Sequence, residues 1–115
     1  MTIERVGLGP RMSQAVVHNG VVYLAGQVAE DASQDVEGQT RQILQSIDTL
    51  LAEVGSDKTR LLQVQIFLAD INDFSAMNTV WDAWVSQRNA PARATTEARL
   101  AAPALKVEIL ATAAV

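Results

Sequence analysis

The sequence contains no cysteine and a single histidine, His18, among its 115 residues. The absence of cysteine excludes disulfides, thiolate metal sites and a cysteine nucleophile. One histidine excludes a zinc site built from several histidines and argues against a Ser-His-Asp triad. His18 precedes Asn19-Gly20, where we expect an exposed turn residue rather than a catalytic one. We therefore expect no metal site of these kinds.

Positive charge is also scarce. The chain has 9 Lys and Arg against 13 Asp and Glu, a net charge of −4, and no basic run. This argues against nucleic acid as the main ligand, because phosphate binding needs clustered Lys and Arg. No leader with a charged and then apolar pattern opens the chain, and no apolar run reaches the ~20 residues of a membrane span. We expect a cytoplasmic protein with no membrane partner.

What the sequence has is apolar residues. They make up 49% of the chain, and charged residues 19%, which suits one folded domain over residues 1–115. A domain of this size has little volume for its surface, so self-association is expected.

Two β-rich runs, residues 12–17 and 21–28, flank His18-Asn19-Gly20 and predict a hairpin with a type I′ turn. Gly26 interrupts the second run. It allows either close approach of a ligand or a packing and twist site.

Two amphipathic helices follow from apolar residues at three- and four-residue steps. The first covers residues 36–54, with Asp35 as N-cap and Gly55 as the residue that ends it. The second covers residues 74–85 after a turn at 70–73 that ends in a capping Asp73.

Three further strands are predicted at residues 62–68, 92–100 and 106–113. The order β-β-α-β-α-β-β describes one α+β domain with a mixed sheet and both helices on one face. The other face would present Gln63, Gln65, Phe67 and Leu110. Such a half-apolar face favours packing on another subunit and would place sites between subunits.

Arg93 and Glu108 are charges on what we predict to be neighbouring core strands. The guanidinium fork of Arg93 fits a carboxylate in two places at once, and Glu108 could hold a water or take its proton. The alternative is structural, with Arg93 paired to Glu97, to Glu108 or to a neighbouring subunit, and Glu108 paired to Arg93 or Lys106.

Several segments, in this order, resemble those of the RidA/YjgF family of reactive-intermediate deaminases, also called the endoribonuclease L-PSP family. They are Leu24-Ala25-Gly26-Gln27-Val28, the helix entered near Gln39, Val64-Gln65-Ile66-Phe67-Leu68, Asp73-Phe74 with Met77-Asn78, Pro91-Ala92-Arg93 and Val107-Glu108-Ile109. The resemblance implies a chorismate-mutase-like fold and a homotrimer with clefts between subunits. It implies hydrolysis of 2-imino or enamine acids, such as 2-iminobutanoate and 2-iminopropanoate, to 2-oxo acids and ammonia, without a cofactor.

The same resemblance assigns roles to residues. Arg93 would grip the substrate carboxylate, Glu108 would orient the attacking water, and Gly26 would line the cleft. Asn78 would organise the site, and Thr95, which stands where many members have cysteine, would contribute its backbone.

The chain departs from the family pattern near its start. Many members follow Gly-Pro with Tyr-Ser, and the tyrosine lines the cleft, whereas Gly9-Pro10 is followed here by Arg11-Met12-Ser13. We expect Arg11 or Ser13 to reach the cleft, and we expect a substrate that differs from those of the best-known members. Alternative functions are a regulatory trimer that binds small carboxylates without turnover, a pathway-specific hydrolase of the same family, and, disfavoured by the acidic charge, ribonuclease or translation inhibition.

Overall fold

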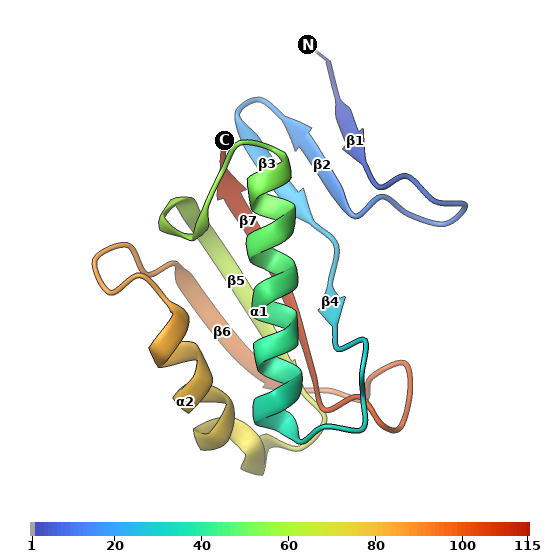
Figure 1. Ribbon diagram of the computed structural model, residues 1–115, viewed down its shortest axis with the longest axis vertical. Coiled ribbons are helices and arrows are strands. Elements are labelled where there is room, and N and C mark those ends of the chain that lie inside the picture. The colour runs from blue at the N-terminus through green and yellow to red at the C-terminus, as the bar shows by residue number, and fades with distance from the viewer. Residues whose placement is uncertain (1) are drawn as a thin grey trace.

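The computed structural model describes residues 2–115 as one mixed sheet with two helices on one face (Figure 1). The strands are β1 (Glu4–Val6), β2 (Ala15–His18), β3 (Val21–Leu24), β4 (Gln27–Val28), β5 (Leu61–Leu68), β6 (Ala92–Glu97) and β7 (Val107–Ala114). The helices are α1 (Val36–Glu53) and α2 (Phe74–Trp84), and short 3₁₀ turns precede β5 (Lys58–Arg60) and α2 (Ile71–Asp73). The predicted α+β class, with both helices on the same side, is confirmed.

The sheet has the order β1-β2-β3-β7-β5-β6, and β4 also pairs with β7. All neighbours are antiparallel except β5 and β6, which run parallel and are joined across the face by α2. A parallel pair needs such a crossover because the chain must return to the same end of the sheet. This order makes β1 and β6 the two edge strands.

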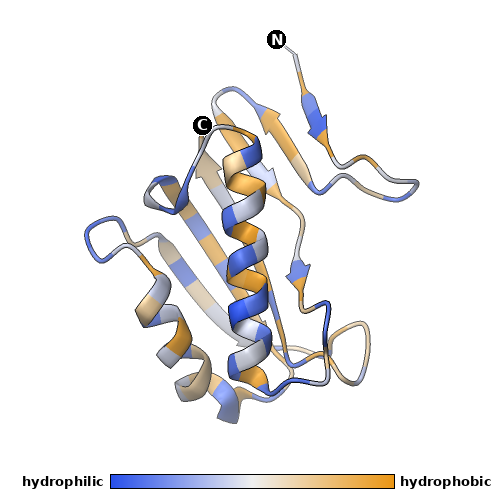
Figure 2. Ribbon diagram, in the orientation of Figure 1, coloured by the Kyte–Doolittle hydropathy of each residue, from blue (hydrophilic) through white to orange (hydrophobic). Residues whose placement is uncertain are grey.

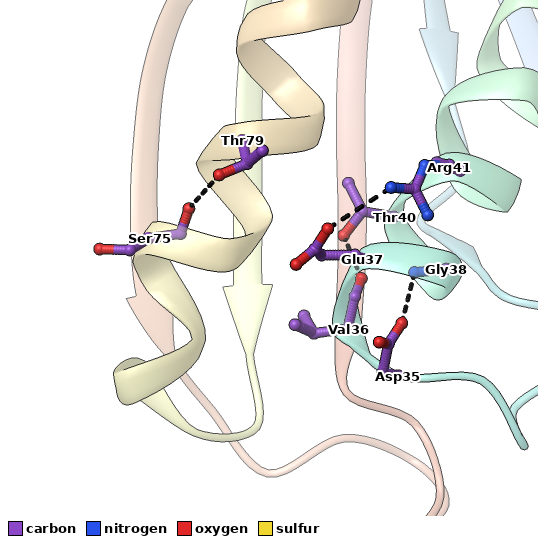
Figure 3. A network of polar contacts seen from close by, with 8 residues as sticks. All are labelled: Asp35, Val36, Glu37, Gly38, Thr40, Arg41, Ser75 and Thr79. Atoms are coloured by element: carbon purple, nitrogen blue, oxygen red, sulfur yellow. Dashed lines mark hydrogen bonds and ion pairs between the residues drawn. The ribbon is translucent and has the colours of Figure 1, made fainter.

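Helix α1 begins at the predicted residue, Val36, and ends at Glu53, one residue before the predicted end. The Asp35 side chain accepts a hydrogen bond of 2.8 Å from the Gly38 N–H, as Figure 3 shows. At the other end Gly55 has φ +77°, and the Ser56 N–H donates to the Leu51 carbonyl at 2.9 Å. This left-handed closure satisfies carbonyls that the helix would leave without a partner.

The side chains of strand β5 project alternately to the two faces of the sheet. Val64, Ile66 and Leu68 are buried beneath the helices, and the residues between them point to the opposite side. Figure 2 shows the resulting alternation of apolar and polar bands along β5. We call the side without helices the open face. It carries Tyr23, Val28 and Leu110, which are 49%, 39% and 37% exposed, together with Gln63, Gln65 and Phe67.

The hairpin turn is as predicted, since Asn19 and Gly20 have φ of +53° and +76°. The strand after it is broken at a bulge. Tyr23 pairs with Thr112 and Gln27 with Ile109, so that three residues, 24–26, lie opposite two residues of β7, 110–111. A bulge of this kind bends a strand and redirects its side chains.

Strand β1 was not predicted from the sequence. Its three residues pair with β2, whose first residue is Ala15, three positions later than the predicted start of the hairpin. Periodicity cannot reveal so short a strand, because it lies at the sheet edge and two of its three residues are exposed. The strand predicted for residues 92–100 ends at Glu97, where its pairing with β5 stops.

The predicted capping role of Asp73 is wrong. Asp73 stands at the start of α2 but makes no capping hydrogen bond with its side chain. Its backbone N–H belongs to the preceding 3₁₀ turn and donates to the Asp70 carbonyl at 3.0 Å. The carboxylate that caps this region is that of Asp70, which accepts from the Asn72 N–H at 2.9 Å.

Candidate active site

Arg93 lies on edge strand β6 and points to the helix side of the sheet. It is paired with Val64 of β5, whose side chain is buried beneath the helices, and directly paired residues project to the same face. Its Nη1 donates a hydrogen bond of 2.8 Å to Oδ1 of Asn78 on α2. Its Cζ lies 5.2 Å from the centre of the Trp81 ring and 5.9 Å from that of Phe74. The arginine is therefore held between β6 and α2.

Thr95 follows two residues later and projects to the same side. It is half-buried, and its hydroxyl oxygen is buried without a hydrogen-bond partner among residues 2–115. A buried hydroxyl without a partner is uncommon and costs stability. Arg93 is therefore in contact with Asn78, and Thr95 lies on the same face of β6 two residues further along.

Glu108 lies on β7 and points the other way. It pairs with Phe67 of β5, whose side chain projects to the open face, and with Val28 of β4. Its carboxylate occupies the place where a side chain at Gly26 would stand. A Cβ built on Gly26 would overlap Oε2 of Glu108 and lie 3.1 Å from its Cδ. Of the two interpretations of Gly26, the packing and twist site is the one that the structure supports, because Gly26 lies in the bulge and leaves room for a carboxylate of its own chain.

The expectation that Arg93 and Glu108 lie on neighbouring strands is wrong. Strand β5 runs between β6 and β7, and the two side chains project to opposite faces of the sheet. Within one chain they cannot reach the same small ligand. Nor do they form a structural ion pair, since the only ion pair across residues 2–115 joins Arg41 to Glu37.

Arg11 and Ser13 lie in the loop between β1 and β2, at the sheet edge opposite Arg93 (Figure 1). The loop is closed by a hydrogen bond of 2.9 Å from the Gln14 N–H to the Val6 carbonyl. Arg11 is exposed and Ser13 half-buried. The candidate residues therefore fall into three places, namely the β6 edge, the open face beside the bulge and the β1–β2 loop.

Two residues beside Arg93 were not assigned to the site from the sequence. Trp81 is a core residue and Phe74 is 40% exposed, and together with Asn78 they form a row at positions i, i+4 and i+7 of α2. Residues at this spacing lie on one face of a helix. The spacing of these three residues is visible in the sequence. It indicates a site only when α2 is known to pack beside β6.

No three His, Asp or Glu side chains within residues 2–115 are grouped so that they could hold a metal ion. In the same part of the chain, neither helix combines the length and the apolar character that crossing a membrane requires.

Comparison with known proteins identifies the class. Residues 5–115 match the family described as Endoribonuclease L-PSP. The RutC family protein YoaB of Escherichia coli is 47% identical over 115 residues, which is the whole of both chains. A RutC family protein of Haemophilus ducreyi is 47% identical over 113 residues, covering 98% of this chain and 97% of that protein. The crystal structure of NMB1025 from Neisseria meningitidis, described as a member of the YjgF protein family, superposes with a TM-score of 0.97 at 47% identity, covering 99% of this chain and 95% of that one.

This chain therefore belongs to the RutC/YjgF/L-PSP family, as its sequence motifs indicated.

Proposed function

We propose that the protein hydrolyses 2-imino and enamine acids to 2-oxo acids and ammonia, at clefts formed between copies of the chain. The observation that carries the proposal is the geometry of Arg93. It is a half-buried guanidinium, fixed on one side by Asn78, with no carboxylate of its own chain paired to it among residues 2–115. An arginine held in this way is suited to a carboxylate ligand.

Arg93 would bind the substrate carboxylate and so fix the neighbouring carbon, which carries the C=N bond. Asn78 occupies one N–H of Nη1, and four of the five guanidinium donors remain for a ligand. Two parallel hydrogen bonds to one carboxylate restrict both its position and its rotation. Such orientation supplies a large part of the rate enhancement in reactions between a bound molecule and water.

Glu108 would hold the attacking water. The water oxygen bonds to the imine carbon while one of its protons passes to the carboxylate. That proton then returns to the nitrogen, the carboxylate takes the hydroxyl proton of the adduct as the C–N bond breaks, and ammonia leaves and picks up this proton, so that a 2-oxo acid and ammonium remain. A protonated imine is already electrophilic, and one positioned carboxylate is therefore adequate for this step.

The two residues can act together only if two chains contribute to each cleft, because they lie on opposite faces of one sheet. The open face, with its half-exposed Tyr23, Val28 and Leu110, would pack on a second copy and bring a partner's edge strand to Glu108. A closed ring built from one repeated interface satisfies every copy equally. We propose the homotrimer that the family resemblance implies.

Single substitutions test the chemistry. We expect Arg93→Ala to abolish both carboxylate binding and ammonia release from freshly generated 2-imino acids. We expect Glu108→Gln to lower kcat by at least about 100-fold while binding of the 2-oxo acid remains, since a positioned base contributes that much. Full activity of Arg93→Ala would refute the proposal. Arg93-dependent binding without any acceleration of ammonia release in the wild type would instead favour a regulatory carboxylate-binding protein.

Mixing the two variants tests where the cleft lies. Each variant is inactive alone, but a mixed trimer contains clefts with an intact Arg93 from one chain and an intact Glu108 from another. Random mixing in equal amounts gives such clefts at about a quarter of the positions in a ring. We expect activity to return to about that level after the chains are unfolded and refolded together. No recovery, in mixed trimers verified by native mass spectrometry, would mean that one chain supplies both residues.

A further inference from the structure

Arg93 is held by groups that carry no charge. Its immediate surroundings are the Asn78 carbonyl oxygen at 2.8 Å and the Trp81 and Phe74 rings, centred 5.2 and 5.9 Å from its Cζ. Both rings lie within the ~6 Å over which a guanidinium is attracted to an aromatic face. These three contacts fix the cation in place, yet none of them neutralises it.

A charged partner at the same place would have a different effect. A carboxylate beside Arg93 would take the strong, charge-assisted hydrogen bonds and compete with any anionic ligand. Aromatic faces reduce the cost of partly burying the cation because the guanidinium is weakly hydrated and stacks well. They leave its N–H groups, which lie in the guanidinium plane, free to bind a ligand.

We infer that Phe74, Asn78 and Trp81 form a neutral cradle whose role is to position Arg93 without neutralising it, so that its affinity for a carboxylate is preserved. The inference rests on the proposed function only in that Arg93 binds a carboxylate; it does not require turnover. It assigns positioning roles to Trp81 and Phe74, and it specifies why an amide rather than an acid stands at Asn78.

The direct test replaces the neutral acceptor by a charged one of the same shape. Asn78→Asp keeps an oxygen within reach of Nη1 but adds a negative charge. We expect the dissociation constant for 2-oxobutanoate, measured by calorimetry, to rise at least about tenfold. A role for Asn78 in orientation alone predicts unchanged or tighter binding, and that result would overturn the inference.

The aromatic part is tested by Trp81→Leu, with Trp81→Phe as the rescue. Loss of the ring should raise the dissociation constant for 2-oxobutanoate about tenfold, and the phenyl ring should restore most of it. If the wild type turns over imines, KM should rise in parallel while kcat changes less than about twofold, because the lost contact acts equally in ground and transition states. Phe74→Leu, at a residue that is 40% exposed, gives a second variant whose folding is not at risk.

Trp84 supplies a matched control on the same helix. Its ring lies 5.3 Å from Nζ of Lys58 and, centre to centre, 5.4 Å from the ring of Trp81, so Trp84→Leu removes a tryptophan that packs behind the cradle and is not one of the two rings beside Arg93. It should change stability but leave carboxylate binding at the wild-type value. Equal binding by wild type, Trp81→Leu and Phe74→Leu, all folded and assembled, would overturn the inference while leaving the proposed function intact. If binding depends on Arg93 but no imine is hydrolysed, the inference about the cradle stands and the proposed deaminase activity is refuted.

Discussion

Replacing Gly26 by alanine should disable the protein without unfolding it. The added Cβ would overlap Oε2 of Glu108 and lie 3.1 and 3.4 Å from its Cδ and Cγ. All three atoms belong to the end of a flexible side chain rather than to backbone. The clash can therefore be relieved if the Glu108 carboxylate rotates away, and the fold has no other reason to change.

The expected loss of kcat follows from the displacement of the Glu108 carboxylate. Real Cβ atoms do not approach other atoms as closely as this overlap, so the carboxylate must leave its position entirely. A general base contributes roughly 10²–10⁴-fold when it is within hydrogen-bond reach of the proton it accepts. We expect kcat for imine hydrolysis to fall by at least about 100-fold. Stability should change by less than about 1 kcal/mol, because φ at Gly26 is not positive and alanine adopts the same backbone without strain.

Gly20 provides the control. An added Cβ there meets nothing within 4 Å, but its φ of +76° is one that alanine adopts only with strain. Gly20→Ala should therefore destabilise the protein by about 1 kcal/mol with kcat unchanged. Gly26→Ala should therefore lose activity but keep its stability, and Gly20→Ala should lose stability but keep its activity. Urea unfolding measures the first property that differs, the free energy of unfolding, and steady-state kinetics measures the second, kcat.

Shortening the acidic side chain at position 108 should partly restore the kcat of Gly26→Ala. Combining Gly26→Ala with Glu108→Asp removes one methylene and withdraws the carboxylate from the new Cβ. We expect the double variant to be more active than Gly26→Ala alone. Wild-type kcat in Gly26→Ala would refute the reasoning, since it would show that the placement of Glu108 beside this glycine has no part in the reaction.

Three further outcomes are expected. Thr95→Val removes the buried hydroxyl that has no partner and should stabilise the chain by about 1 kcal/mol in urea unfolding, with carboxylate binding retained; destabilisation would show that the hydroxyl is satisfied in the assembled protein. Leu110→Arg on the open face should reduce self-association in sedimentation velocity, whereas Ala52→Arg, at an exposed residue of α1, should not. Hydrogen bonds from the hydroxyl and backbone N–H of Thr59 lower the pKa of Asp57 below its usual 3.8. Its stabilising contribution is therefore present above about pH 4 and lost as pH falls through the lowered pKa, so Asp57→Ala should be less stable than wild type at pH 6 and approach it at pH 2.5; a constant difference would contradict this.

Most of the fold could be predicted because the relevant signals are local. Asp35 and Gly55 mark the ends of α1 through capping hydrogen bonds and a positive φ, which depend on one or two residues each. Asn19-Gly20 determines the hairpin in the same way. What was missed depends on pairing at a distance. The length of β6 is set by its ladder with β5, and β1 exists only because β2 offers it an edge.

The same distinction between local signals and distant pairing applies to the candidate site. Arg93 and Glu108 could be singled out because charges in apolar strands are unusual. Their relative placement could not be read from the sequence, because the strand order β7-β5-β6 and the face of each side chain follow from the three-dimensional pairing. The strands that carry them are consecutive in the sequence and were expected to be neighbours. One intervening strand and one reversal of face keep them apart within a single chain.

If the proposed function holds, this separation ties activity to assembly. Each chain would carry half of the proposed cleft at its β6 edge and the other half on its open face, so an isolated chain would have no complete site. The apolar residues of the open face, with Leu110 at 37% exposure, would stabilise the assembly that completes it. Activity per chain should therefore fall on dilution below the dissociation constant of the assembly and return on concentration. Leu110→Arg should lose activity in proportion to its loss of assembly, although its Arg93 and Glu108 are intact. A fully active monomer would show that both halves of the cleft can be supplied by one chain.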